Sequence, residues 1–142
     1  MKKLTRAECL EFLMAQPRTA KIATVRPDGR PHVVPIWFTL DGEDLLFTTW
    51  HTTAKTRNLR HSPWVSMCID DEAPPFAFVK FDGTVEFSDD LAALLHWATI
   101  IGGRYMGADQ AEAFGRRNAV PGELLVRVAP AAIYGESDIA AW

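Results

Sequence analysis

Residues 31–60 read PHVVPIWFTLDGEDLLFTTWHTTAKTRNLR. The first ten of these residues, 31–40, are mostly apolar and include several β-branched and aromatic side chains, which predicts a long strand. The Asp-Gly pair that follows marks a tight turn over 41–44, and the apolar run over 45–50 predicts a second, antiparallel strand. A short basic helix then ends near Arg60. We expect the rest of the chain to be arranged around this strand pair and its helix.

Two prolines restrict where the first of these strands can lie. Pro31 and Pro35 lack the backbone N–H that a central strand uses for pairing, so we expect this strand at an edge of the sheet or bulged. An open strand edge attracts a second chain unless something covers it. A partner subunit is one way to cover this edge, so the edge is consistent with a dimer.

The rest of the chain continues the β pattern. Further strands are predicted over residues 21–25, 64–69, 76–81, 84–88 and 124–128. The Asp82-Gly83 pair is the strongest hairpin signal in the chain and predicts a turn between two of these strands. Six or seven antiparallel strands with short connections predict a mainly β fold, a small β-barrel that forms one domain over residues 1–142.

Helices are predicted before and within this β pattern. A capping box of a hydroxyl and a carboxylate begins a helix over 7–15. Another helix is predicted over 91–101, where Gly102-Gly103 interrupts it, and a short helix starts near Asp109. The barrel is thus expected to carry an N-terminal helix and a helical insertion before its last strand.

Composition limits the class of partner. The 142 residues are 48% hydrophobic and carry a net charge of −3, so a packed core is possible and nucleic acid is not an expected partner. No run approaches the ~20 apolar residues of a membrane span and no signal peptide is recognised, so we expect a cytoplasmic protein. Cys9 and Cys68 are expected to be reduced thiols, and no spacing typical of metal ligands occurs.

The basic helix could bind an anion. A helix N-terminus presents free backbone N–H groups. Here the helix also carries the hydroxyl of Thr53, the charges of Lys55 and Arg57 and the amide of Asn58. A phosphate would find charge and hydrogen-bond donors in one place. The alternative is a solvated basic helix with an ordinary threonine cap at Thr52 or Thr53, and the residues by themselves leave both interpretations open.

Four aromatic residues, Trp37, Phe38, Phe47 and Trp50, belong to the two strands that lead into this helix. They could pack in the core, as aromatic residues on strands usually do, or offer a flat surface to a ring. A ring-sized apolar surface beside an anion site suggests a phosphorylated cofactor that contains a ring. His51 is the only histidine considered for a function, and a polar loop residue is the alternative.

Several of these segments follow an order found in a known family. They read KIATVRPDGRPHVVPIWF, LLFTTW, AKTRNLR, GRY and GELLVRV, and they start at residues 21, 45, 54, 103 and 122. The ordered set resembles the pyridoxamine-phosphate-oxidase-like split β-barrel superfamily, whose fold is FMN-binding-like. Within it, the chain looks most like the small oxidoreductases and reductases that use the deazaflavin coenzyme F420.

This resemblance implies a homodimer with a cofactor site at each end of the subunit interface. The cofactor phosphate would be held by the basic helix, at Thr53, Ala54, Lys55, Arg57 and Asn58. The ring would lie on the strand pair, at Val34, Pro35, Ile36, Trp37, Thr48 and Thr49. The second subunit would wall the site, with Pro75, Phe76, Phe78, Arg104 and Tyr105.

The resemblance also implies a reaction. Reduced F420 would pass a hydride to an activated C=C or C=O of a small, planar, hydrophobic substrate. No side chain is identified as catalytic, and the proton would come from water, Tyr105 or His51. Two alternatives stay open, namely an FMN-binding oxidoreductase of the same fold and a non-catalytic cofactor carrier.

Overall fold

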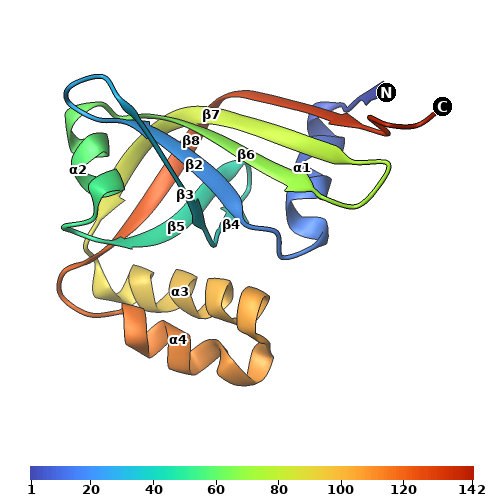
Figure 1. The fold of residues 1–142 in the computed structure, drawn as a ribbon. Helices are drawn as coiled ribbons and strands as arrows, with labels where there is room; N and C mark the ends of the chain where they lie inside the picture. Colours follow the sequence, from blue (N-terminus) through green and yellow to red (C-terminus); the bar gives the residue numbers. More distant parts are fainter.

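One antiparallel sheet of eight strands organises the chain, and the computed structural model describes all of residues 1–142 (Figure 1). The strands are β1 (Lys2–Lys3), β2 (Ala20–Val25), β3 (Pro31–Ile36), β4 (Thr39–Asp41), β5 (Asp44–Trp50), β6 (Trp64–Asp71), β7 (Ala77–Ser88) and β8 (Glu123–Ser137). Their order is β3-β2-β6-β7-β8-β5-β4, and β1 pairs with the end of β8. The helices are α1 (Arg6–Ala15), α2 (Ala54–His61), α3 (Leu91–Met106) and α4 (Ala111–Asn118), with a 3₁₀ turn η1 (Ala108–Gln110). These elements confirm the predicted mainly β fold, the N-terminal helix and the helical insertion.

The sheet forms a split barrel that does not close. Its two end strands, β3 and β4, follow one another in the chain, separated only by Trp37 and Phe38. The strand expected over 31–40 is therefore broken, because the chain leaves one end of the sheet and joins the other at this point. Phe38 is fully buried, and its backbone N–H donates to the hydroxyl of Tyr105 instead of to a neighbouring strand. The edge position predicted for the proline-containing strand β3 is confirmed.

The hairpin predicted at Asp82-Gly83 is wrong. Ala77–Ser88 is one strand, β7, which pairs with β6 on one side and β8 on the other. Its register against β8 shifts between Asp82 and Gly83, as in a bulge. A Cβ on Gly83 would overlap the carbonyl of Ala129, so glycine here lets β8 approach closely. The connection from β6 to β7 is instead the loop that ends at Phe76, a residue expected in a strand, which has a φ of 67°.

The Gly102-Gly103 pair does not interrupt the helical insertion, contrary to the prediction. Helix α3 runs from Leu91 to Met106 without a break, and α4 packs back against it to form a hairpin beside the barrel (Figure 1). A Cβ on Gly102 would overlap the Cβ of Phe114 on α4. The absent side chain therefore serves the contact between two helices and does not mark a helix end.

Replacing Gly102 with alanine should lower the free energy of unfolding by about 1–3 kcal/mol. Overpacking between α3 and α4 outweighs the ~0.5–1 kcal/mol that alanine gains over glycine inside a helix. Gly103→Ala is the matched control, because its Cβ would lie 3.1 Å from the Cβ of Ala111 and a small shift relieves this contact. Urea unfolding of both variants measures the difference, and equal stabilities would contradict the close helix contact.

The interior of the barrel is apolar. Phe38, Phe47 and Phe81 are its largest fully buried side chains, and α1 adds Cys9 to the same cluster. Core packing is thus the role of two of the four aromatic residues on the strand pair. Cys9 is buried, Cys68 is exposed, and both are free thiols. None of the helices has the length and apolar character that a membrane crossing needs.

Candidate functional site

Threonine hydroxyls fix the start of α2 against β5. The Thr53 hydroxyl caps the helix by accepting from the backbone N–H of Thr56 at 3.4 Å. It also lies 2.9 Å from the hydroxyl of Thr49 and 2.8 Å from that of Thr56, which donates to the carbonyl of Trp50. Thr49 and Thr56 are buried. The helix begins where the sequence predicts, but these hydroxyls bond within the chain. The part played by Thr56 was not predicted.

Asn58 attaches α2 to the sheet. Its side chain is buried, and its Nδ2 donates to the hydroxyl of Thr24 on β2 over 3.0 Å. The Asn58 amide, which was expected to donate to a bound anion, thus holds α2 against the sheet. The groups of α2 that stay free include the backbone N–H groups of Ala54 and Lys55. The charges of Lys55 and Arg57 also have no ion pair.

Basic side chains surround a hollow next to α2, which we call the arginine hollow. It has a volume of about 480 Å³ and is lined by Arg26, Pro27, Asp28, Arg30, His32, Ala54, Arg57 and Asn58. Arg30 pairs with Asp28 at 2.8 Å, which leaves Arg26 and Arg57 without an acidic partner. The Nδ1 of His32 is buried and lacks a hydrogen-bond partner. Buried polar atoms are normally paired, so the hollow fits an oxygen-rich anion.

A second hollow, which we call the inner pocket, lies between the barrel and the α3–α4 hairpin and has a volume of about 410 Å³. Its barrel side is formed by Thr19, Pro35, Ile36, Trp37, Thr48 and Lys55, and its hairpin side by Ala98, Ile101, Gly102, Phe114, Arg117 and Asn118. Four residues predicted for the ring thus meet Lys55 of the basic helix in one pocket. Val34 and Thr49, which were predicted with them, do not line it.

Lys55 is the charged group that the inner pocket partly encloses. Burial lowers the pKa of Lys55, and the nearby Glu123 carboxylate acts in the opposite direction. A half-buried ammonium group without an ion pair favours an incoming anion. Lys55 follows Ala54 of the arginine hollow directly, and strand β3 runs from His32 in that hollow to Pro35 in the inner pocket. One elongated ligand could therefore contact both hollows.

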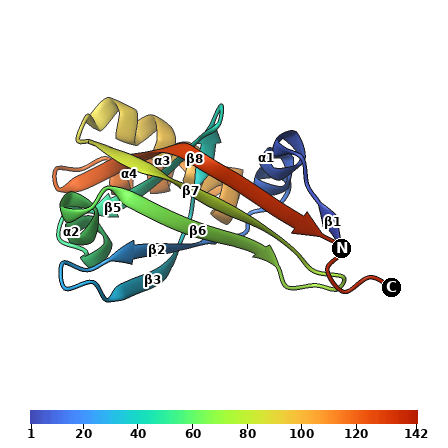
Figure 2. The same ribbon diagram turned by 90° about the horizontal axis from the view of Figure 1, so that it is seen from above.

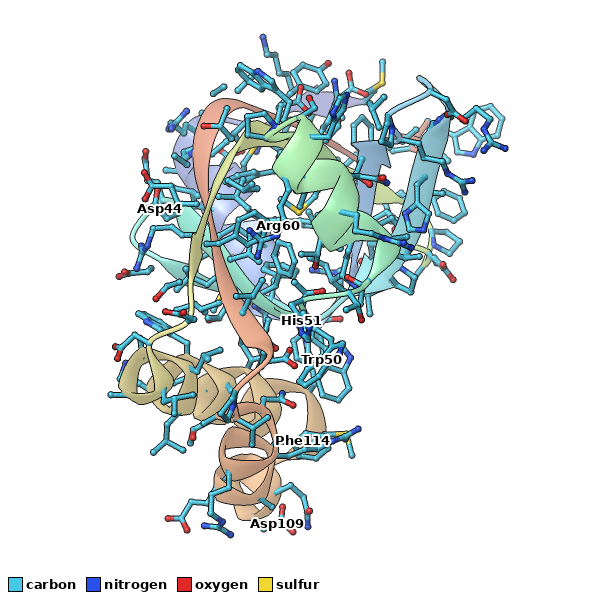
Figure 3. The ribbon with its side chains drawn as sticks, turned by 90° about the vertical axis from the view of Figure 1, so that its left-hand side faces the viewer. Asp44, Trp50, His51, Arg60, Asp109 and Phe114 are labelled. Carbon is cyan, nitrogen blue, oxygen red and sulfur yellow. The ribbon has the colours of Figure 1, made fainter.

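Trp37 forms the flat part of the inner pocket. Its ring stacks on Tyr105, with 5.1 Å between centroids and 3° between planes, and Phe114 lies 5.7 Å away at a tilt. Trp37 is still 37% exposed, so part of its ring is free to contact a ligand. Trp50, the other exposed aromatic residue of the strand pair, packs beside His51, and Figure 3 shows these two below α2 on the side of Phe114.

Both side chains considered as proton donors already make hydrogen bonds within the chain. The Tyr105 hydroxyl donates to the carbonyl of Arg18 at 2.7 Å and accepts from the N–H of Phe38 at 3.2 Å. Burial raises the pKa of Tyr105 further above its usual value. The Nδ1 of His51 lies 2.9 Å from the carbonyl of Gly122. Geometry therefore assigns no catalytic side chain.

Arg104 joins three elements of its own chain. Its guanidinium donates to the carbonyls of Leu13 and Gln16 at 2.6 and 2.9 Å, and to the carbonyl of Phe38 at 3.0 Å. It also lies over the ring of Phe38, 4.6 Å from its centroid. Helix α1, helix α3 and the β3–β4 junction thus meet at this side chain. Tyr105 stacks on Trp37 and Arg104 contacts Phe38 of the same chain. Their expected part in walling the site of a second subunit stays a prediction.

Pro75, Phe76 and Phe78 lie away from both hollows. The β6–β7 loop is at the opposite end of the sheet from α2 in both views (Figures 1 and 2). There Phe76 and Phe78 line a separate hollow of about 430 Å³ together with Cys68 and Ile139. Within one chain these residues do not reach the inner pocket. Their predicted part in the site requires a second chain and stays a prediction.

The hairpin side of the inner pocket was missed by sequence reasoning. Phe114 and Arg117 are three residues apart on α4 and so share a helix face, which was a usable signal. Glu123, at the start of β8, was missed as well. Burial raises the pKa of Glu123, whereas Thr48, Lys55 and Arg117 act to lower it. Nothing local in the sequence indicates that these groups come together.

Comparison with known proteins adds to this geometry. Residues 5–136 match the family described as pyridoxamine 5'-phosphate oxidase. A solved structure named F420 reductase is 30% identical, with a TM-score of 0.63, and the match covers 87% of this chain and 94% of that chain. A conserved hypothetical protein from Mycobacterium tuberculosis is 25% identical over 92% of this chain and 82% of its own, with a TM-score of 0.79. A search of curated proteins finds no significant match.

A more distant structure shares the fold. An FAD-binding protein from Mesorhizobium loti is 21% identical over 94% of this chain and 93% of its own, with a TM-score of 0.71. The family match over residues 5–136 confirms the predicted split-barrel superfamily, while the use of F420 stays a prediction. Because the family match spans nearly the whole length, the chain belongs to the pyridoxamine 5'-phosphate oxidase family.

Proposed function

We propose that the protein is an F420-dependent reductase that acts as a cytoplasmic homodimer on an activated C=C or C=O of a small, planar, hydrophobic substrate. The 30% identity to the structure named F420 reductase, over 94% of that chain, supports the proposal. The observation that carries it is the position of Lys55, an unpaired and half-buried cation between the arginine hollow and the inner pocket.

The residues present fit the charge and shape of such a cofactor. Lys55 and Arg57 would hold its phosphate, together with the first-turn N–H groups at Ala54, while Thr53 and Asn58 fix the helix start that presents them. The ring would lie on the barrel side of the inner pocket, at Pro35, Ile36, Trp37 and Thr48. When bound, reduced F420 supplies the hydride.

The chain itself would orient the reactants and keep water away. Ile36 and Ile101 line the inner pocket from its two sides and, with Phe114, give it an apolar surface beside its polar groups. A dry site strengthens the attraction between Lys55 and an anion. Because the Tyr105 hydroxyl is already bonded twice, we assign the proton to water in this reaction.

A second subunit belongs to the proposal. Strand β3 is an edge strand with an exposed Val33, and it offers an open edge for a partner chain. The β6–β7 loop with Pro75 and Phe76 is too far from its own inner pocket and would wall the pocket of the partner subunit. Light scattering should give the mass of two chains, and a monomer would remove this two-chain site.

Turnover of reduced F420 tests the proposed reaction. Under anaerobic conditions, a reductase should oxidise reduced F420 when it is offered menadione or an unsaturated lactone, and the absorbance of F420 reports the change. Binding of F420 without turnover of any acceptor would favour the carrier. Oxidation of reduced FMN, with no oxidation of reduced F420, would favour the flavin enzyme.

A further inference from the structure

We propose that the hairpin side of the inner pocket selects a planar substrate that carries a carboxylate, and that Arg117 binds this group. The inference rests on the proposed function, because a cofactor ring on the barrel side leaves the hairpin side for the substrate. It adds a charged group to the hydrophobic substrate proposed above.

The two arginines in the last turn of α4 differ in what they contact. Arg116 pairs with Glu112 one turn earlier, at 3.5 Å, and both side chains are exposed. Arg117 lines the inner pocket, lies over the ring of Phe114 at 5.6 Å from its centroid and has no ion pair. Arg116 is thus paired on the surface, whereas Arg117 stays available at the inner pocket.

The charges around the pocket favour an anion. Lys55 and Arg117 are two cations, and Glu123 is the one carboxylate that acts on both, so one positive charge is in excess. Burial raises the pKa of Glu123, which works against its negative form. The C-terminal end of helix α4 contributes only about half a negative charge, less than the full charge of Arg117.

The shape and lining of the inner pocket limit the size and polarity of the substrate ring. Ala98, Ile101 and Phe114 give the hairpin side an apolar surface, and Arg117 and Asn118 stand beside it. The volume of about 410 Å³ is shared with the cofactor ring, so a substrate of one or two fused rings fits. A guanidinium binds a carboxylate through two parallel hydrogen bonds, which would fix the orientation of the ring.

Two probes that differ in one group test the inference. Coumarin-3-carboxylate and coumarin-3-carboxamide are both planar, and only the first is charged. Calorimetry on the protein saturated with F420 should give about tenfold tighter binding of the carboxylate. Arg117→Gln should remove this preference, mainly by weakening binding of the carboxylate, whereas Arg117→Lys should retain part of it. Arg116→Gln is the matched control and should behave as the unmodified protein.

Equal affinity of the unmodified protein for the two probes would overturn the inference, as would a preference that survives in Arg117→Gln. Arg117 is exposed, and a thermal unfolding curve of each variant verifies that it is folded. A separate F420 titration distinguishes a failure of the substrate inference from a failure of the proposed function. If F420 binds and the preference is absent, the substrate inference alone fails. If F420 does not bind while the probes still discriminate through Arg117, the proposed function fails.

Discussion

Lys55→Ala is expected to weaken F420 binding by about 1.5–3 kcal/mol, a loss of about ten- to hundredfold in affinity. The ammonium of Lys55 is half-buried and makes no ion pair in the chain, so an anion in the site would gain a charge-assisted hydrogen bond, although the nearby Glu123 carboxylate also attracts this ammonium. Calorimetric or fluorescence titration measures the loss. Arg60→Ala is the control on the same helix, because Arg60 lies over Phe87 and lines neither hollow. Unchanged affinity in Lys55→Ala would contradict the anion site.

Removing the charge of Lys55 should have the opposite effect on stability, because it should make the ligand-free protein more stable. Burial holds the pKa of Lys55 below its usual value in the folded chain, so the unfolded chain binds more protons between the two pKa values. Stability therefore rises with pH through that window, and the full cost of burying the charge is present at pH values below it. Lys55→Met should raise the unfolding temperature of the ligand-free protein at pH 7 while it weakens binding. If Lys55 had only a structural role, its removal would instead destabilise the protein.

Arg104→Met is expected to lower the free energy of unfolding by about 2–4 kcal/mol. It removes the shared partner of the Leu13, Gln16 and Phe38 carbonyls, and partly buried acceptors left without a donor are costly. Urea unfolding measures the effect. Because Arg104 joins α3 to the β3–β4 junction, the variant should also loosen the stack of Tyr105 on Trp37 and weaken ligand binding.

Two further variants test whether the loss of stability comes from the hydrogen bonds of Arg104. One keeps its charge, and the other removes an exposed arginine elsewhere. Arg104→Lys keeps the charge, but one ammonium group cannot reproduce a planar fork that reaches three carbonyls, so we expect it to recover no more than about half of the loss. Arg116→Ala removes an exposed arginine and should change stability by less than ~0.5 kcal/mol. A loss below ~0.5 kcal/mol in Arg104→Met itself would show that water replaces the three bonds freely.

Local patterns predicted most of the fold. The turn over 41–44, the strand over 45–50 and the threonine cap of the basic helix all depend on neighbours in the chain, and the structure has them where they were expected. Pro31 and Pro35 indicated an edge strand for the same reason, since a missing N–H is a property of the residue itself. The resemblance to a family supplied the split barrel that these elements build.

Glycine misled the prediction twice, because it serves turns and close contacts equally. Asp82-Gly83 has the composition of a hairpin turn, yet Gly83 makes room for the backbone of β8. Gly102 has the composition of a helix end, yet it makes room for Phe114 on a second helix. In both cases the deciding neighbour lies far along the chain, so a local reading could not identify it.

The residues of the candidate site also fall into those that local sequence predicted and those that depend on distant parts of the chain. The basic helix and the β3 residues were predicted from their own segment and family pattern, and the structure brings Lys55 and Trp37 to one pocket. Arg117 and Glu123 escaped prediction because their positions depend on how the α3–α4 hairpin packs against the barrel. His32 escaped because its unpaired nitrogen is visible only when the surrounding hollow is known.

The most direct test of the account is a side-by-side equilibrium titration of the purified protein with F420 and with FMN, monitored by calorimetry. We expect F420 to bind at least about tenfold more tightly than FMN and Lys55→Ala to lose most of that affinity. Tight binding of FMN, together with no measurable binding of F420, would contradict the central claim.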